Sequence, residues 1–523
     1  MTQEPKGLYS AAQLAALFQS GPAEAREARF VADLAQALRH APPAHVPVAL
    51  VHCLAHTVLT SVDPARAMQH WLRYLDSIAD HAAFWRLVSG AVEAFGAILR
   101  VFASSQFLSS LLWRRPPLLD WLLAGALHGP SPTPQALQDE LAQHLGTVTD
   151  DSHAGALIRA FTQQHLLRIG ARDLSGLADV ALTTADLSAV ADSVLQAALD
   201  VCHRWLTARH GAPTYHDADG VLRPCGFCVI GMGKLGGYEL NFSSDIDLMY
   251  VYTSYEGHTS GRTPEGQPVE PISNHEYFVT LARRLTTLIG GQGAEGHAFR
   301  VDLRLRPEGT QGQLALSLPS YEAYYARLAQ PWERMALIKA RTVAGDRDLG
   351  EAFAMLVRPF VYQRHLDGDG VRHIRAMKHQ IDVQLADRAQ SRTHVKLGLG
   401  GIREIEFLIQ LPQLLYGGRQ AALQEPHSLR ALPKLREAGL LSAEVEGTLR
   451  DTYCYLRRLE HYLQMEQGAQ THTLPRQAAQ QIRVARHFGY STWEMFYQEY
   501  LERTATVHRI FLALFQEDET THT

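Results

Sequence analysis

A glycine-rich segment followed closely by two aspartates restricts the possible fold of this chain most strongly. Residues 228–252 read CVIGMGKLGGYELNFSSDIDLMYVY and contain the G-x-G-x-x-G pattern of dinucleotide-binding folds. That pattern requires a crossover helix after the glycines and an acidic residue about twenty positions further on. Here only a short stretch separates Gly237 from Asp245, and Val251 stands where the acid would be. The sequence therefore argues against a dinucleotide site, and the leucine after Lys234 argues against a Walker phosphate loop.

The two aspartates lie in an apolar run that is typical of a strand. Side chains two apart on a strand point to the same face, so we expect Asp245 and Asp247 to converge. Two carboxylates this close repel each other unless a cation neutralises them. Because Mg²⁺ prefers carboxylates together with substrate phosphates, the pair predicts a site for Mg²⁺ or Mn²⁺. A pair of surface acids is the alternative.

A second segment, FRVDLRLRPEG at 299–309, supplies further charged residues. Its alternating polarity predicts a strand with Asp302, Arg304 and Arg306 on one face. Asp302 would complete a two-metal site with the other two acids. The arginines suit phosphate oxygens, because a guanidinium forms paired hydrogen bonds with them.

The rest of the chain indicates an α+β protein that is predominantly helical. Helical spacing dominates from about residue 10 to 199, short β-type runs appear after about 213, and helices return after about 346. We predict an N-terminal helical region at 1–195, a small mixed α/β catalytic domain at 196–345 and a C-terminal helical bundle at 346–523. The polar segment 254–276 predicts a long surface loop.

The composition of the chain limits the kinds of partner and the cellular compartment that we expect for it. The formal net charge is −5, with 46% hydrophobic and 20% charged residues, so neither nucleic acid nor disorder is expected. Five scattered cysteines favour a reducing compartment. We see no signal peptide and no apolar run of about 18 residues, so we expect a cytoplasmic protein without a membrane span.

Two later motifs carry charged residues on predicted helices. In WERMALIKAR at 332–341, Lys339 and Arg341 belong either to a solvated face or to the surroundings of a nucleotide. In KLGLGGIREIEF at 396–407, Gly400 and Gly401 precede a helix whose free backbone N–H groups would favour an anion near Lys396. The alternative there is an amphipathic helix with an Arg403–Glu406 pair.

Together with GMGKLGGYELNFSSDIDL and RPFVYQRHLD, these motifs make the chain similar to the glutamine synthetase adenylyltransferase/adenylyl-removing enzyme family. The similarity runs from about residue 108 to 515 and implies a nucleotidyltransferase domain of the polymerase-β type. The family carries two such domains in tandem, whereas this chain holds one. The sequences of two of its motifs, ELNFSSDIDL and GGIREIEF, are more similar to the adenylyl-removing half of the family's proteins than to the adenylyltransferase half.

The resemblance implies phosphorolysis of adenylylated glutamine synthetase, with orthophosphate entering and ADP leaving. It places Asp245, Asp247 and Asp302 at the metal, with Arg304 and Arg306 stabilising the transferring group. Residues near the nucleotide phosphates would be Gly233, Lys234, Gly236, Gly237, Ser243, Ser244, Lys339, Arg341, Gly400, Gly401, Arg403 and Glu406. The alternatives are an ATP-dependent adenylyltransferase acting on the same synthetase, or a docking module for the synthetase or a PII signalling protein.

Overall fold

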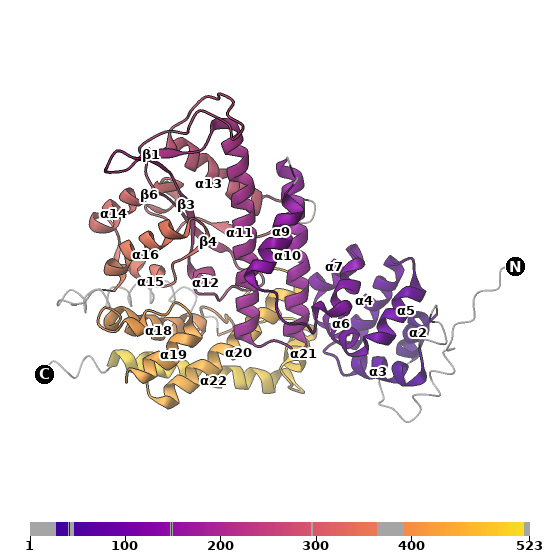
Figure 1. The fold of residues 1–523 in the computed structure, drawn as a ribbon. Helices are drawn as coiled ribbons and strands as arrows, with labels where there is room; N and C mark the ends of the chain where they lie inside the picture. The colour runs from indigo at the N-terminus through magenta and orange to yellow at the C-terminus, as the bar shows by residue number, and fades with distance from the viewer. Residues whose placement is uncertain are drawn as a thin grey trace. The chain divides into compact units, whose positions relative to one another are not determined.

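A computed structural model describes the chain over residues 28–39, 41, 46–146, 148, 150–293, 296–362 and 392–516. These residues are mainly helical, with one five-stranded sheet and a separate two-stranded sheet of β1 and β2, which confirms the predicted α+β class (Figure 1). The chain divides into two compact units. The first draws on 1–131, 164–183 and 457–502, and the second on 132–163, 184–456 and 503–523.

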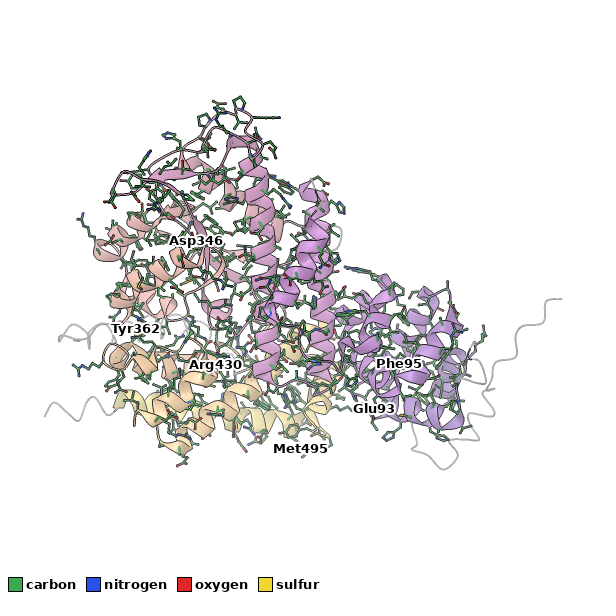
Figure 2. All side chains as sticks on the ribbon, in the orientation of Figure 1. Glu93, Phe95, Asp346, Tyr362, Arg430 and Met495 are labelled. Atoms are coloured by element: carbon green, nitrogen blue, oxygen red, sulfur yellow. The ribbon has the colours of Figure 1, made fainter. Side chains whose placement is uncertain are left out.

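The first unit is helical throughout its described residues. Helix α4 shows how the sequence sets its elements, because Asp63 accepts a hydrogen bond from the Arg66 amide (3.1 Å) and Pro64 opens the first turn. Its core is aromatic, with Trp71 packed edge-on against Phe95, which is labelled in Figure 2 (5.6 Å between ring centroids). The elements are α2 (Ala28–Ala37), α3 (Val48–Leu59), α4 (Pro64–Ser77), α5 (His81–Gly90), α6 (Val92–Ser104), α7 (Gln106–Arg114), α8 (Pro117–Trp121), the π-helix η3 (Leu122–Ala126) and α21 (Ala478–His487).

Four long helices contribute residues to both units: α10 (Asp151–Leu174), α11 (Val180–His210), α20 (Ala443–Gln467) and α22 (Trp493–Gln516). Among the described helices, none is by itself long and apolar enough to cross a membrane, and only the sharply bent pair α5 and α6 passes that test when joined.

The second unit holds all the strands of the described chain. Its helices are α9 (Pro134–Leu145), α12 (Gly233–Gly236), α13 (Asn274–Gly290), α14 (Leu318–Arg327), α15 (Pro331–Leu337), α16 (Arg347–Val361), α18 (Ile402–Tyr416) and α19 (Ser428–Glu437), with 3₁₀ turns η4 (Gly309–Gln311) and η5 (Ala421–Leu423). Its strands are β1 (Thr214–His216), β2 (Leu222–Pro224), β3 (Phe227–Gly231), β4 (Ile246–Tyr252), β5 (Val301–Asp302), β6 (Ala315–Ser317) and β7 (Arg341–Gly345).

The main sheet has the strand order β5-β4-β3-β7. Strands β4 and β7 run antiparallel to the central β3. Both β5 and β6 pair in parallel with β4, β5 near its start and β6 near its end. This arrangement sets the beginning of β4 beside β5, where the predicted acids lie.

Strand alternation sends side chains to two different cores. Cys228 and Ile230 of β3 pack with α14 and α16, which lie on one side of the sheet (Figure 1). Phe227 faces the other way and stacks on Phe278 of α13 (5.6 Å between ring centroids). Asp346, labelled in Figure 2, directly follows β7 and accepts from the Leu349 amide, so it starts α16 as its N-cap. The central strands are thus buried on both faces.

Several predicted elements are confirmed and two need correction. The short β-type runs around the glycine motif and the two aspartates form β3 and β4, and the polar segment 254–276 contains only isolated bridges before α13 begins. The strand predicted over 299–309 is wrong beyond residue 302, because β5 contains only Val301 and Asp302. The helix predicted over 332–341 ends at Leu337, and Arg341 begins β7 instead. The motif RPFVYQRHLD lies partly outside the described residues.

Candidate active site

The glycine motif forms a tight turn between β3 and the short helix α12. Gly233 has a left-handed backbone (φ +54°), and a Cβ there would lie 2.7 Å from Oδ2 of Asp247. The Met232 amide donates to the Asp247 carbonyl (2.8 Å). Glycine is therefore required here both for the backbone conformation and for the close approach to β4. The turn sets a bare stretch of backbone against the second aspartate of D-x-D.

The three predicted acids lie at one end of the sheet. Asp247 stands opposite Asp302 in the parallel pairing of β4 and β5, and Asp245 directly precedes β4. Burial, helped by the charges of Asp302 and Asp245, raises the pKa of Asp247 to about 6, although Lys396 and Arg304 act in the opposite sense. The structure thus gathers acids that are more than fifty positions apart in the sequence.

Guanidinium groups hold two of these acids. Arg300 donates to Asp245 (Nε to Oδ1, 2.6 Å) and to the carbonyl of Ser243, whose side chain is buried. The side chain of Arg304 forms a paired contact with Asp302 (Nε to Oδ2, 2.9 Å), which lowers the pKa of that carboxyl against the effect of burial. Our sequence analysis missed Arg300, although it lies two residues before Asp302 in the same motif.

The chemistry of the three acids fits a hard divalent cation. All the side-chain donors are carboxylate oxygens, and the raised pKa of Asp247 reflects burial and then the negative charge of Asp302 and Asp245, which a cation would relieve. As they stand, no group of three or more His, Cys, Asp or Glu side chains in the described part of the chain is arranged to hold a metal ion. Arg300 and Arg304 instead provide the positive charge beside Asp245 and Asp302.

The two predicted arginines after Asp302 do not share its strand face. The Arg304 amide donates to Oδ1 of Asp302 (2.9 Å), which turns the chain and ends β5. The Arg304 side chain stays 74% exposed. Arg306 donates to the carbonyls of Leu303 (2.7 Å) and Gly312 (3.2 Å), so it braces the following loop. Of these two arginines, Arg304 is the one whose side chain is both exposed to solvent and next to the acids.

Lys339 and Arg341 lie behind the glycine turn rather than on a solvated face. Arg341 pairs with Asp192 (2.8 Å), donates to the Leu235 carbonyl (3.0 Å) and lies over the ring of Tyr238 (3.8 Å). Lys339 is buried, and its backbone carbonyl lies only 1.5 Å from where a Cβ on Gly236 would be. Both residues therefore support the backbone of α12, whose Lys234 is half-buried.

The glycines before α18 form a closed turn, which corrects the prediction of free N–H groups there. Gly400 has φ +68°, and a Cβ on it would lie 1.7 Å from the Thr504 carbonyl. The first helical amides are already used, since Ile402 donates to Val395 (3.1 Å) and Arg403 donates to Lys396 (3.0 Å). Packing against α22 and internal capping therefore explain these glycines better than anion binding by the backbone.

The first two turns of α18 carry the motif's charged residues. The Arg403 side chain is exposed, whereas Glu406 is buried and contacts the Lys339 ammonium (3.2 Å). Glu239 contacts the same ammonium (2.5 Å). Our sequence analysis did not identify Glu239. An acid flanked by Tyr238 and Leu240 at the end of the glycine turn was the available signal.

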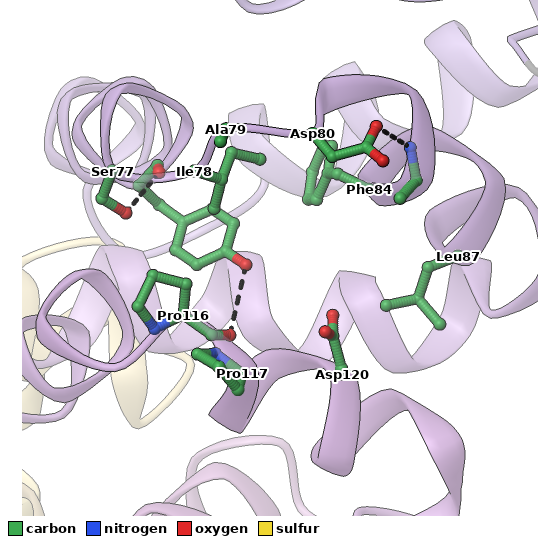
Figure 3. Close-up of a pocket in the computed structure, with 11 residues that line it drawn as sticks. Ser77, Ile78, Ala79, Asp80, Phe84, Leu87, Pro116, Pro117 and Asp120 are labelled. Carbon is green, nitrogen blue, oxygen red and sulfur yellow. Dashed lines mark hydrogen bonds between the residues drawn. The ribbon is translucent and has the colours of Figure 1, made fainter.

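A separate pocket of about 390 Å³ lies within the first unit (Figure 3). Tyr74 lines this pocket and donates to the Pro116 carbonyl (3.5 Å), while Asp80 caps α5 through the Ala83 amide (2.8 Å). Its lining comes from residues 74–87 and 116–120, and the residues predicted for nucleotide binding lie in other segments.

Comparison with known proteins gives one family match before residue 355 and another after residue 375. A model of the glutamate-ammonia ligase adenylyltransferase family matches residues 95–355. A model of the GlnD PII-uridylyltransferase family matches residues 375–515.

Three relatives carry the description "bifunctional glutamine synthetase adenylyltransferase/adenylyl-removing enzyme". The protein of Stenotrophomonas maltophilia (strain R551-3) is 42% identical over 76% of this chain and 40% of its own length. The protein of Nitrosococcus oceani is 39% identical over 79% of this chain and 42% of its own length. The protein of Pseudomonas aeruginosa is 36% identical over 85% of this chain and 44% of its own length.

The chain thus spans about two fifths of the length of the curated relatives it matches. The matched regions include the glycine turn, the three acids and the helices that follow them. The chain belongs to the glutamate-ammonia ligase adenylyltransferase family.

Proposed function

We propose that this chain removes AMP from an adenylylated tyrosine of glutamine synthetase by phosphorolysis. The observation that carries the proposal is the pairing of Asp247 with Asp302 beside the glycine turn at Gly233. The direction of the reaction is supported by the resemblance of ELNFSSDIDL and GGIREIEF to the adenylyl-removing half of the family. The name of the relatives includes adenylyl removal beside adenylyl transfer.

In the proposed reaction, an orthophosphate oxygen bonds to the phosphorus of AMP as the bond from phosphorus to the tyrosine oxygen breaks. The products are ADP and the free tyrosine, and the proton of the attacking hydrogen phosphate balances the one gained by the phenolate. A phenolate is a tolerable leaving group, so positioning and charge neutralisation account for most of the rate.

Asp245, Asp247 and Asp302 would hold Mg²⁺ or Mn²⁺, which supplies neutralisation of the phosphate charges when bound. The backbone from Gly233 to Gly237 would lie against the phosphates, with Gly233 next to Asp247, because glycine has no side chain to keep them away. Arg304 has the open guanidinium next to the acids and would contact the transferring group.

The other predicted residues have supporting roles in this proposal. Lys339 and Arg341 keep the glycine turn in place. Ser243 and Ser244 lead the chain into Asp245, with the Ser243 carbonyl fixed by Arg300. Lys234, Lys396 and Arg403 add positive charge, since all three act on the nearby carboxyl of Glu406.

The test supplies adenylylated synthetase with orthophosphate and a divalent cation, and measures ADP. We expect ADP from the wild-type chain and none from Asp247→Asn. A matched reaction with unmodified synthetase and ATP measures pyrophosphate, which would reveal the adenylyltransferase direction instead. If neither product forms, or if the aspartate variant matches wild type, the proposed activity is wrong.

We further propose that the region after residue 375 takes part in regulation by a PII-type protein. The support is the family match of this region to GlnD PII-uridylyltransferase. Adding a uridylylated or unmodified PII protein to the ADP assay tests this, and an unchanged rate with both forms would contradict it.

A further inference from the structure

A buried cluster of charged residues lies behind the glycine turn, on its side away from solvent. Glu239 and Lys339 are 1% and 5% exposed, and Glu406 is 7% exposed. Oε2 of Glu239 lies 2.5 Å from Nζ of Lys339, and Oε1 of Glu406 lies 3.2 Å from the same nitrogen. Ser428 accepts from Lys339 as well (3.2 Å), so all three ammonium protons have acceptors.

Glu239 is the residue on which this cluster converges. Its carboxylate accepts from the Ser428 amide (2.8 Å), the Ser428 hydroxyl (3.3 Å) and the Tyr453 hydroxyl (3.1 Å), in addition to Lys339. The Ser428 amide begins α19, so Glu239 also satisfies an N-terminal donor of that helix. One side chain from the end of the glycine turn thus binds Lys339 and two separate C-terminal helices, α19 and α20.

The opposite charges within the cluster each favour the ionised form of the other. Burial alone would lower the pKa of Lys339, but Glu239 and Glu406 outweigh it and raise that pKa. Burial would raise the pKa of Glu406, but Lys339 and the cationic groups around it lower it. The Lys339 ammonium and the Glu406 carboxylate therefore stay ionised, and a satisfied buried network of this kind rigidifies its surroundings.

Lys339 transmits this rigidity to the turn by direct contact. Its backbone carbonyl lies against Cα of Gly236, and its Cδ lies 3.1 Å from where a Cβ on Gly237 would be. Directly after these glycines, Tyr238 is held in a left-handed conformation (φ 58°), which a non-glycine residue adopts only when its neighbours impose it. Fixing Lys339 therefore fixes the backbone that faces Asp247 at the other end of α12.

We infer that Glu239 is a positioning residue, which acts through Lys339 and Glu406 to hold the glycine turn in the geometry required for phosphate transfer. The inference rests on the proposed function for its effect on turnover. Its effect on the turn itself does not depend on which reaction the chain catalyses. The C-terminal helices α18, α19 and α20 are thereby part of what shapes the catalytic turn.

The test compares Glu239→Gln with wild type by hydrogen exchange of the amides in 232–239 and by kcat and KM for orthophosphate. A glutamine has the same size but turns an N–H group towards donors, so it breaks the network without leaving a cavity. We expect these amides to exchange faster by roughly tenfold or more, and kcat to fall by a similar factor. The matched control is Glu446→Gln, a buried carboxylate paired with Arg436 and Arg450 in the same unit.

A triple variant separates positioning from mere charge burial. Lys339→Met with Glu239→Gln and Glu406→Gln removes all three charges, so we expect its melting temperature to recover towards wild type. Exchange in 232–239 and kcat should nevertheless stay altered, because nothing then holds the turn.

Wild-type exchange and kcat in Glu239→Gln would overturn the inference, as would an equal change in Glu446→Gln. If Glu239→Gln does not fold, Glu406→Gln decides by the same measurements. If the wild-type chain shows no turnover in either direction, the proposed function fails, and the exchange data alone decide the role of the cluster.

Discussion

In the proposed function Asp247 combines two opposing properties, because it must be ionised to hold the cation but burial makes its ionisation costly. Its pKa is raised to about 6 by burial and by the two neighbouring acids. Asp247→Asn should therefore lower turnover about 100-fold or more while the melting temperature stays the same or rises. ADP release and thermal unfolding measure the two effects.

The control for this change is Asp451→Asn, at an exposed position on α20. Asp451→Asn should change neither the rate of ADP release nor the melting temperature. Near-normal phosphorolysis by Asp247→Asn would contradict the metal assignment, and a large drop in its melting temperature would show that the residue is mainly structural.

His70 offers a pH test within the first unit. Its ring contacts the Phe102 carbonyl (Nδ1, 2.8 Å) and the Gln106 side chain (Nε2, 2.8 Å), and burial followed by the charge of Arg66 lowers its pKa from 6.5. Between its lowered folded pKa and 6.5, the unfolded chain binds more protons than the folded one. The stability supplied by neutral His70 is thus present above pH 6.5 and is lost as the pH falls below it.

We therefore expect wild type to lose stability between pH 7 and pH 5 more steeply than His70→Gln. The difference in slope is at most about 1.4 kcal/mol per pH unit, the limit for one proton. Denaturant unfolding at several pH values measures it. Parallel slopes for the two proteins would show that His70 does not titrate as its surroundings imply.

At the scale of elements, the junction of β3, α12 and β7 depends on a glycine with no room for a side chain. A Cβ on Gly236 would lie 1.5 Å from the Lys339 carbonyl and 2.6 Å from the Gly231 carbonyl, both backbone atoms. Gly236→Ala should therefore destabilise the protein by about 1–3 kcal/mol or more, because the backbone of two elements must move. Urea unfolding measures this, and ADP release should fall with it.

Gly447→Ala is the matched control, since Gly447 lies inside α20 and a Cβ there would meet nothing within 4 Å. Alanine should stabilise that helix by up to about 1 kcal/mol. Equal effects of the two substitutions would mean that the contact around Gly236 relaxes easily.

Local patterns predicted the central elements well but failed where one contact redirects the chain. The apolar runs gave β3 and β4, and the G-x-G-x-x-G spacing correctly excluded a crossover helix. The alternation in 299–309 suggested a longer strand, but the Arg304 amide and guanidinium both turn back to Asp302. A period-2 pattern cannot reveal such a local hydrogen bond, because it records polarity and not partners.

The acids of the candidate site could be predicted from the sequence, but the residues that hold the glycine turn in place could not. Asp247 and Asp302 were expected together, and the register of β4 with β5 brings them opposite each other. Glu239 escaped notice because its partners, Lys339, Ser428 and Tyr453, are 100 to 214 positions away. Such pairings are set by tertiary packing and leave no periodic trace in the sequence.

At the scale of the whole molecule, ligand binding should be visible as a gain in stability. A ligand that binds only the folded state at a hundred times its dissociation constant stabilises it by about 2.7 kcal/mol. We expect Mn²⁺ with ADP to raise the melting temperature of wild type and removal of the metal by EDTA to reverse the gain. Asp247→Asn should show little gain, and an equal gain in both proteins would place the ligand elsewhere.

The separation between Glu239 and Tyr453, 214 positions along the chain, has a consequence during synthesis on the ribosome. A growing chain produces the glycine turn and all three acids well before it produces α18, α19 and α20. Until those helices emerge, water must solvate Glu239 and Lys339 in place of their final partners. The glycine turn is consequently secured only after Tyr453 has been made, and an interrupted polypeptide ending before Tyr453 would have its acids but an unsecured turn.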